Sequence, residues 1–233
     1  MSKMKSKLFI VGLGATAEEI RLFVEKYALY DIAGFAVNHN YISTDSFHGY
    51  PIYAIEQLDE VVDKENDLIF VALFWNHLNN DRKKLYEALK KDGYRFATLI
   101  SPKSDVNQSH IGENCWISDN VYIKPNVKIN DNTFINAGAI VEINTTIGKH
   151  CFIATGSVVG GSCHIEDQCF VGLNATIFDH TVVGHHSIIG AATAIKRNVP
   201  PCTLVKISSD TVNVTGYQVD EISEKLVVQK NIR

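Results

Sequence analysis

Every sixth residue from Ile111 to Ile195 is isoleucine or valine, and the pattern runs through fifteen hexads without an insertion. A fixed short period of this kind is the sequence signature of a repeat architecture. The series is Ile111, Ile117, Ile123, Ile129, Ile135, Val141, Ile147, Ile153, Val159, Ile165, Val171, Ile177, Val183, Ile189 and Ile195.

A second column has the same period and fixes the phase of the repeat. Four residues after each member of the first series stands a small or β-branched residue, from Cys115 to Val199. The two columns predict a parallel β-helix in which each hexad is one short strand and a corner. Three hexads make one triangular coil, so the pattern predicts five coils. Glycines follow the interior residue where a side chain would crowd the bend. They are Gly112, Gly148, Gly160, Gly172, Gly184 and Gly190.

The cysteines fit the same repeat. Four of the five, Cys115, Cys151, Cys163 and Cys169, stand in the small-residue column, so a disulfide framework is not predicted. Cys163, His164 and Cys169 are the nearest approach to a zinc motif. Neighbouring residues of a hexad point in different directions, so we expect no metal site.

Residues 7 to about 100 read as a small α/β domain. Strands are expected at Leu8–Val11, Ile32–Val37 and Leu68–Leu73, and helices after Gly14, over Glu56–Val62 and from about Asp81 to Lys91. The Gly-rich turn between the first strand and its helix presents backbone N–H groups to a phosphate, or simply closes a tight turn.

Asn38 follows the second strand, where a dinucleotide fold usually has an acid for the ribose hydroxyls, so NAD is disfavoured.

Composition excludes some partners. The chain is 45% apolar and 21% charged, with a net charge of -4 and no basic stripe, so we expect a folded protein that does not bind nucleic acid. No apolar run is long enough to cross a bilayer, so no membrane association is expected. The lysines and apolar residues before Ala17 are better explained by a first strand than by a signal peptide, which predicts a cytoplasmic protein.

The whole chain resembles the sialic acid O-acetyltransferase and bacillosamine N-acetyltransferase group of hexapeptide-repeat sugar acyltransferases. The resemblance rests on the hexads and on short motifs of the first half: Phe9–Gly12, Ala33–Phe35, Gly49–Ile52, Gly93–Ile100 and Pro102.

It implies a Rossmann-like domain over 1–100 that holds a nucleotide-linked sugar. A left-handed parallel β-helix over 101–200 and a C-terminal capping tail over 201–233 follow. It also implies a homotrimer with acetyl-CoA, or another acyl-CoA, in the groove between two β-helices, and a role in surface polysaccharide or glycan synthesis.

The chain departs from that group at three places. Thr16 stands where the Gly-rich turn usually has histidine. Ile143 and Asn144 take the positions of the catalytic histidine and of the acid that orients it. Lys206–Asp210 replaces a Gly-x-Pro-Ala loop that touches coenzyme A. Isoleucine cannot accept a proton, so the usual mechanism does not transfer.

The missing base favours an amino sugar as acceptor. A sugar hydroxyl needs a base, whereas part of a sugar amine is neutral near pH 7–8 and attacks unaided. Asn144 would position the amine, and His164 is the preferred substitute if a base is needed. His150, His164 and His180 are all expected near the surface of the β-helix, where each is a solvated side chain unless it serves as a base.

The resemblance also suggests which residues bind the two substrates. Gly161 would give its backbone N–H to the acyl carbonyl, unless it serves only the bend; Lys196 and Arg197 would meet coenzyme A phosphates, unless they are a solvated pair. The full donor-site set is Gly160, Gly161, Ala191, Ala192, Lys196 and Arg197. The expected nucleotide-sugar set is Gly12, Gly14, Thr16, Asn38 and Asn76.

Three hypotheses remain at this point. The preferred one is an acyl-CoA-dependent N-acyltransferase, with acetyl as the expected group, acting on a nucleotide-linked amino sugar. The second is an O-acetyltransferase with His164 or another histidine as base. The third is a catalytically inactive trimer that binds sugar nucleotides as a partner protein.

Overall fold

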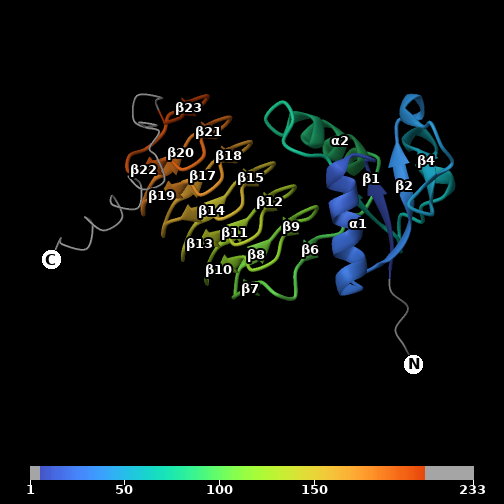
Figure 1. Cartoon of the computed structure of the whole chain (residues 1–233), viewed down its shortest axis with the longest axis horizontal. Helices are drawn as coiled ribbons and strands as arrows, with labels where there is room; N and C mark the ends of the chain where they lie inside the picture. Colours follow the sequence, from blue (N-terminus) through green and yellow to red (C-terminus); the bar gives the residue numbers. More distant parts are fainter. Residues whose placement is uncertain (1–5, 208–233) are drawn as a thin grey trace, which may run out of the picture.

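The computed structural model describes residues 6–207, which form two packed parts (Figure 1). The first is a five-stranded sheet in the order β3-β4-β2-β1-β5, parallel except at β3. Its strands are β1 (Lys7–Val11), β2 (Asp31–Val37), β3 (Ser46–Phe47), β4 (Tyr50–Ala54) and β5 (Leu68–Val71). The expected α/β arrangement is therefore present.

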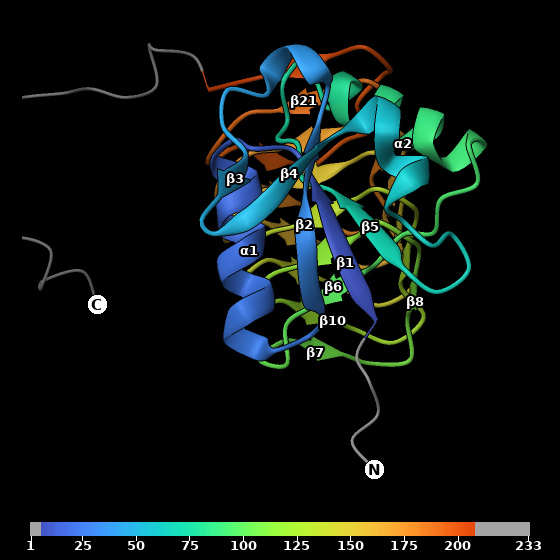
Figure 2. The same cartoon turned by 90° about the vertical axis from the view of Figure 1, so that its right-hand side faces the viewer.

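Two helices cover opposite faces of this sheet (Figure 2). α1 (Ala15–Tyr27) buries Ala17, Ile20 and Val24 at helical spacing, and it lies on the face toward the β-helix. α2 (Asn80–Lys91) packs with the other face, together with the 3-10 helix η2 (Ile55–Glu60).

Three details of the first part differ from the sequence-based expectation. The helix expected over Glu56–Val62 is the shorter 3-10 helix η2, and the third strand ends at Val71 rather than Leu73. The edge hairpin of β3 and β4 was not predicted as strands; a second 3-10 helix, η1 (His39–Tyr41), precedes it.

The second part is the predicted parallel β-helix. Each two-residue strand pairs in parallel with the equivalent strand of the next coil, as in Tyr122 with Ile140 and Phe134 with Phe152. Every interior Ile or Val from Ile117 onward is buried, and so is every residue of the small column. The coil geometry expected from the hexads is confirmed.

The three sides of the β-helix have different surroundings. The docked side faces the first part, the groove side carries an apolar surface, and the polar side carries His110, Lys128 and His164. The docked side contains β6 (Leu99–Ile100), β9 (Trp116–Ile117), β12 (Phe134–Ile135), β15 (Phe152–Ile153), β18 (Phe170–Val171), β21 (Ile188–Ile189) and β23 (Leu204–Val205). The groove side contains β7 (Asp105–Val106), β10 (Tyr122–Ile123), β13 (Ile140–Val141), β16 (Val158–Val159), β19 (Thr176–Ile177) and β22 (Ala194–Ile195). The polar side contains β8 (His110–Ile111), β11 (Lys128–Ile129), β14 (Thr146–Ile147), β17 (His164–Ile165) and β20 (Val182–Val183).

One residue at each corner has a left-handed backbone. From Asn114 to Ala192, every sixth residue has a positive φ between 50° and 70°. Asparagine and glycine tolerate this region best, which explains why Asn recurs at this step of the hexad.

An aromatic column joins the two parts. Trp116, Phe134, Phe152 and Phe170 follow one another up the docked side, and Phe152 and Phe170 stack at 5.3 Å. The first three are buried in one core with α1 and the sheet.

The predicted division at residues 100 and 200 stays a prediction. Most of the predicted capping tail, 201–233, lies outside the described residues, as does the end of the Lys206–Asp210 loop.

Candidate active site

A shallow groove of about 410 Å³ lies on the groove side, at the corner toward the polar side. It is lined by Glu142, Ile143, Val158, Gly160, Gly161, Thr176, Ile177, Phe178 and Asp179. The structure thus brings the two predicted donor-site glycines together with Ile143, the residue expected at the position of the catalytic histidine.

Steric crowding explains the glycine at one of these two positions and not at the other. A Cβ on Gly160 would lie 2.6 Å from the backbone nitrogen of Asp179, so the packed coils demand glycine there. A Cβ on Gly161 would meet nothing closer than 3.5 Å, and its φ is not positive. The bend therefore does not explain Gly161, whereas an open groove does.

The N–H of Gly161 already has a partner. It donates to Oδ1 of Asp179 at 2.7 Å. The expected role of this N–H as a donor to the acyl carbonyl would require the carboxylate to move away. The same contact recurs elsewhere: the N–H of Lys149 donates to Asp167 at 2.7 Å.

Asn144 stands at the corner beside the groove rather than in its lining. Its φ is 59°, and its Oδ1 accepts a hydrogen bond from Nδ2 of Asn126 at 3.2 Å. Asn126 occupies the same left-handed column one coil earlier, so the fold by itself favours asparagine at this position.

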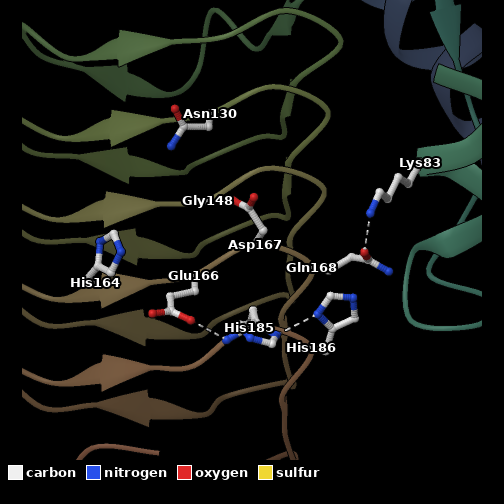
Figure 3. Close-up of a pocket in the computed structure, with 9 residues that line it drawn as sticks. All are labelled: Lys83, Asn130, Gly148, His164, Glu166, Asp167, Gln168, His185 and His186. Atoms are coloured by element: carbon white, nitrogen blue, oxygen red, sulfur yellow. Dashed lines mark hydrogen bonds between the residues drawn. The ribbon is translucent and has the colours of Figure 1, made fainter. Parts of the chain in front are cut away.

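His164 lines a different pocket, shown in Figure 3. It projects from β17 on the polar side, near Glu166, His185 and His186. The rings of His185 and His186 approach within 2.9 Å at their Nδ1 atoms. The structure therefore does not bring His164 and Gly161 into one cavity.

The remaining donor-site candidates lie on later coils. Lys196 extends over the ring of Phe178, with Nζ 5.3 Å from the centroid, so it reaches the groove residues. Arg197 is exposed beside it. Ala191 and Ala192 lie on the opposite edge of the groove side, at the corner between β21 and β22.

The expected nucleotide-sugar residues gather at the carboxyl ends of β1, β2 and β5. Gly12, Gly14 and Asn38 line a pocket of about 650 Å³, and Gly14, Thr16 and Asn76 line an adjoining pocket of about 330 Å³. Asn38 is near Glu56, whose carboxylate accepts from the His39 N–H.

Gly12 and Gly14 differ in whether a side chain would fit, as Gly160 and Gly161 do. Gly12 has a φ of +131°, and its missing Cβ would meet the carbonyl of Ala72 at 3.0 Å. Gly14 has open space around it and is the N-cap of α1, with no side-chain cap. No side chain therefore caps the first N–H groups of α1, which begins beside the two pockets that Gly14 lines.

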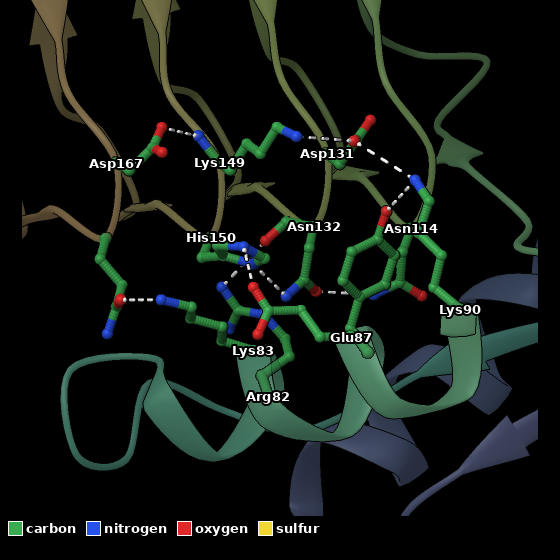
Figure 4. Close-up of polar contacts among 12 residues, drawn as sticks. Arg82, Lys83, Glu87, Lys90, Asn114, Asp131, Asn132, Lys149, His150 and Asp167 are labelled. Atoms are coloured by element: carbon green, nitrogen blue, oxygen red, sulfur yellow. Dashed lines mark hydrogen bonds and ion pairs between the residues drawn. The ribbon is translucent and has the colours of Figure 1, made fainter. Parts of the chain in front are cut away.

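The expectation that His150 is solvated is wrong. His150 is 4% exposed because α2 covers its corner of the β-helix (Figure 4). It belongs to a polar ladder: Asn114 donates to Asn132 at 2.7 Å, and Asn132 and Nδ1 of His150 are 2.8 Å apart. Burial and the nearby charges of Lys83 and Arg82 lower the pKa of His150 to about 4. His150 is thus an interface residue, whereas His180, as expected, is exposed.

Arg82 lies in the same interface and was not predicted. Its guanidinium is fully buried and donates to the carbonyls of Asn132 and Cys151 at 3.3 and 3.0 Å, while it covers the Phe134 ring at 4.0 Å. No ion pair of Arg82 occurs within residues 6–207. The helical pattern of α2 gives no signal for a buried arginine.

Residues 6–207 hold no group of three or more His, Cys, Asp or Glu side chains arranged for a metal ion. In the same range, no helix is long and apolar enough to cross a membrane.

Known proteins agree with this architecture. The sequence profile of the GMPPB C-terminal domain matches residues 100–199, the β-helix. A search of curated proteins finds no match. The acetyltransferase domain of PglB from Neisseria gonorrhoeae, solved with acetyl coenzyme A, has a similar structure, with a TM-score of 0.75 and 20% identity over 86% of this chain and 95% of that one.

PerB from Caulobacter crescentus, solved with CoA and GDP-perosamine, gives a TM-score of 0.74 and 22% identity, over 85% of this chain and 93% of that one. WeeI from Acinetobacter baumannii gives 0.62 and 19%, over 85% of this chain and 96% of that one. These likenesses establish a shared fold across both parts of the chain.

Proposed function

We propose that this protein is an acyl-CoA-dependent N-acyltransferase, with acetyl-CoA as the expected donor, that acts on a nucleotide-linked amino sugar. The observation that carries the proposal is the open groove beside Gly161. A Cβ would fit at Gly161 without steric overlap, so the packing of the coils does not require glycine there. Similar folds were solved with acetyl coenzyme A and with CoA plus GDP-perosamine, which supports the same pair of ligands here.

The nucleotide-sugar end of the reaction fits the Rossmann-like first part. The uncapped N-terminus of α1 follows Gly14, and helix N-termini favour phosphate because their N–H groups are unpaired and their dipole is positive. The adjoining pockets, lined by Gly12, Asn38, Thr16 and Asn76, offer room for the rest of the nucleotide sugar.

The groove favours an amine over a hydroxyl. No histidine lines it, and Ile143 stands where a base would be needed to ionise a hydroxyl. A neutral amine attacks a thioester without prior deprotonation, and only its product proton has to be removed. Asn144 beside the groove is placed to orient such an acceptor.

The donor site would be completed by a second copy of the chain. Tyr122, Ile140 and Val158 project from the groove side and are only partly covered, while Leu173 and Phe178 are about half exposed at its edges. Exposed apolar side chains gathered on one side of a molecule favour protein contact. A homotrimer of left-handed β-helices would bury it and enclose CoA between neighbours, near Lys196 and Arg197.

The experiment is to incubate the protein with acetyl-CoA and a panel of nucleotide-linked amino sugars while following thiol release. Turnover with an amino sugar, and none with the matching hydroxy sugar, supports the proposal. Turnover only with hydroxyl acceptors, abolished in His164→Asn, would replace it with O-acetyl transfer. Tight binding of nucleotide sugars without any turnover would indicate an inactive binding partner instead.

A further inference from the structure

Two titratable side chains line the groove, and they differ in whether they form an ion pair. Glu142 is paired with Lys124, whose Nζ lies 2.6 Å from Oε2. Asp179 accepts a hydrogen bond from the Gly161 N–H through Oδ1, and it has no ion-pair partner within residues 6–207. One oxygen of Asp179 therefore stays available in the groove.

The position of Asp179 follows from the repeat. Ile143, Gly161 and Asp179 stand at the same step of three successive coils, so they lie above one another in one column. Because Gly161 has no side chain, nothing in that column stands between the carboxylate and Ile143. A Cβ at residue 161 would lie 3.7 Å from Oδ1 of Asp179 and 3.8 Å from Cγ2 of Ile143.

We propose that Asp179 is the proton acceptor of the acyl transfer, held in place by the Gly161 N–H. This inference rests on the proposed function, and it changes the part played by Gly161. The N–H orients a carboxylate instead of binding the acyl oxygen, and the carboxylate takes over from the missing histidine.

The carboxylate carries one proton from the amine to the leaving sulfur. The neutral amine nitrogen of the sugar attacks the thioester carbonyl carbon, so a C–N bond forms while the C–S bond breaks and its electron pair leaves with sulfur. The nitrogen loses its extra proton to the free oxygen of Asp179. The carboxyl then passes that proton to the thiolate, which yields the amide, the CoA thiol and the original carboxylate.

Asp167 offers a matched control. It accepts the Lys149 N–H at the same distance of 2.7 Å, but it lies on another corner, outside the groove. Asp179→Asn and Asp167→Asn both keep an oxygen that accepts the backbone N–H, and both lose the ability to take up a proton. The pair separates proton transfer from backbone capping.

The test measures kcat, KM and melting temperature for both variants with an acceptor found active for the wild type. We expect Asp179→Asn to lower kcat by about 10²–10⁴-fold with KM for the nucleotide sugar and melting temperature near wild type. Its remaining rate should keep rising with pH, since solvent then takes the proton. Asp167→Asn should stay within about twofold of the wild type.

Two results would overturn the inference while leaving the proposed function intact. One is a kcat for Asp179→Asn within about threefold of an active wild type, which would leave Asp179 as a backbone cap only. The other is a higher rate in Asp179→Asn, which would mean that the carboxylate blocks the Gly161 N–H from the acyl oxygen. No turnover by the wild type with any acceptor would overturn both.

Discussion

His150 and His180 occupy equivalent corner positions with nearly identical backbones, at φ of 58° and 59°. Their surroundings are opposite, because α2 covers the corner of His150 and solvent covers that of His180. The hexad position alone could not distinguish them. What distinguishes them is a contact with a helix that belongs to the first part of the chain, outside the repeat.

The buried imidazole should make stability depend on pH. Its folded pKa of about 4 lies below the value of about 6.5 expected in the unfolded chain, so the unfolded chain binds more protons between these values. Stability should therefore fall as pH falls from 6.5 toward 4, by up to about 3 kcal/mol.

Melting temperatures at pH 7 and pH 5 test this. His150→Asn should lose less stability on acidification than the wild type, because asparagine suits the left-handed corner and carries no titratable group. His180→Asn is the control and should retain the wild-type pH dependence. Equal acid sensitivity in wild type and His150→Asn would show that other groups control it.

The interior small-residue column should tolerate a change of side-chain polarity better than an increase in side-chain volume. Cys163 is buried in a column that also holds serine, alanine and threonine. Cys163→Ser should be mild, whereas Cys163→Leu should overpack the coil and cost about 1–3 kcal/mol. Urea denaturation measures both. A harmless leucine would contradict the assignment of this column to the interior.

At the scale of the hexad, we expect alanine substitutions at the adjacent Gly160 and Gly161 to have different effects on stability. Gly160→Ala should destabilise the protein by about 1–3 kcal/mol, because its Cβ would overlap Asp179, whereas Gly161→Ala should melt near the wild type. Thermal unfolding tests the difference. If Gly161→Ala keeps its melting temperature and loses activity, the groove rather than the bend requires glycine there. Equal destabilisation by both would remove that argument.

The sequence predicted the coils well because their determinants are local and repeated. Interior Ile and Val, the small column and the crowded glycines are each imposed by contacts with the next coil. The left-handed corner was missed, although Asn114, Asn120, Asn126 and Asn132 mark it at every sixth position. Asn144 belongs to that series, so the corner geometry by itself favours asparagine there.

At the scale of the whole molecule, the site was only partly predictable. The resemblance led to Gly161. His164 was chosen because it follows the glycine-rich bend, but its side chain lies on the polar side and lines another pocket. Asp179 was missed, although a sequence signal exists: the same spacing of glycine and aspartate recurs at Gly112 and Asp131 and at Gly148 and Asp167, with the same backbone hydrogen bond. The aromatic column of the docked side was visible in the sequence as one aromatic residue in each of four successive coils: Trp116, Phe134, Phe152 and Phe170.

The exposed apolar residues of the groove side lead to a prediction about the oligomeric state. We expect a trimer in solution, because burying this surface gains about 25 cal/mol per Å² of apolar area. Multi-angle light scattering at micromolar concentration measures the mass. Tyr122→Lys, on the groove side, should weaken the trimer, whereas Lys128→Glu on the polar side is the matched control. A monomeric wild type would remove the inter-subunit donor site.

The contacts of Arg82 limit how the two halves of the chain can be exchanged by recombination. Its buried cation donates to the carbonyls of Asn132 and Cys151 in the β-helix, and also to those of Leu73 and Phe74 in the first part. A recombinant that joins these coils to a foreign α/β half would leave the Asn132 carbonyl without this donor, whereas the Cys151 carbonyl would keep the Phe134 N–H. The first half transferred to other coils would bury this charge with only two of its four carbonyl acceptors. The two halves should therefore be inherited together, and exchange between relatives should succeed only where both sides of this contact travel as one block.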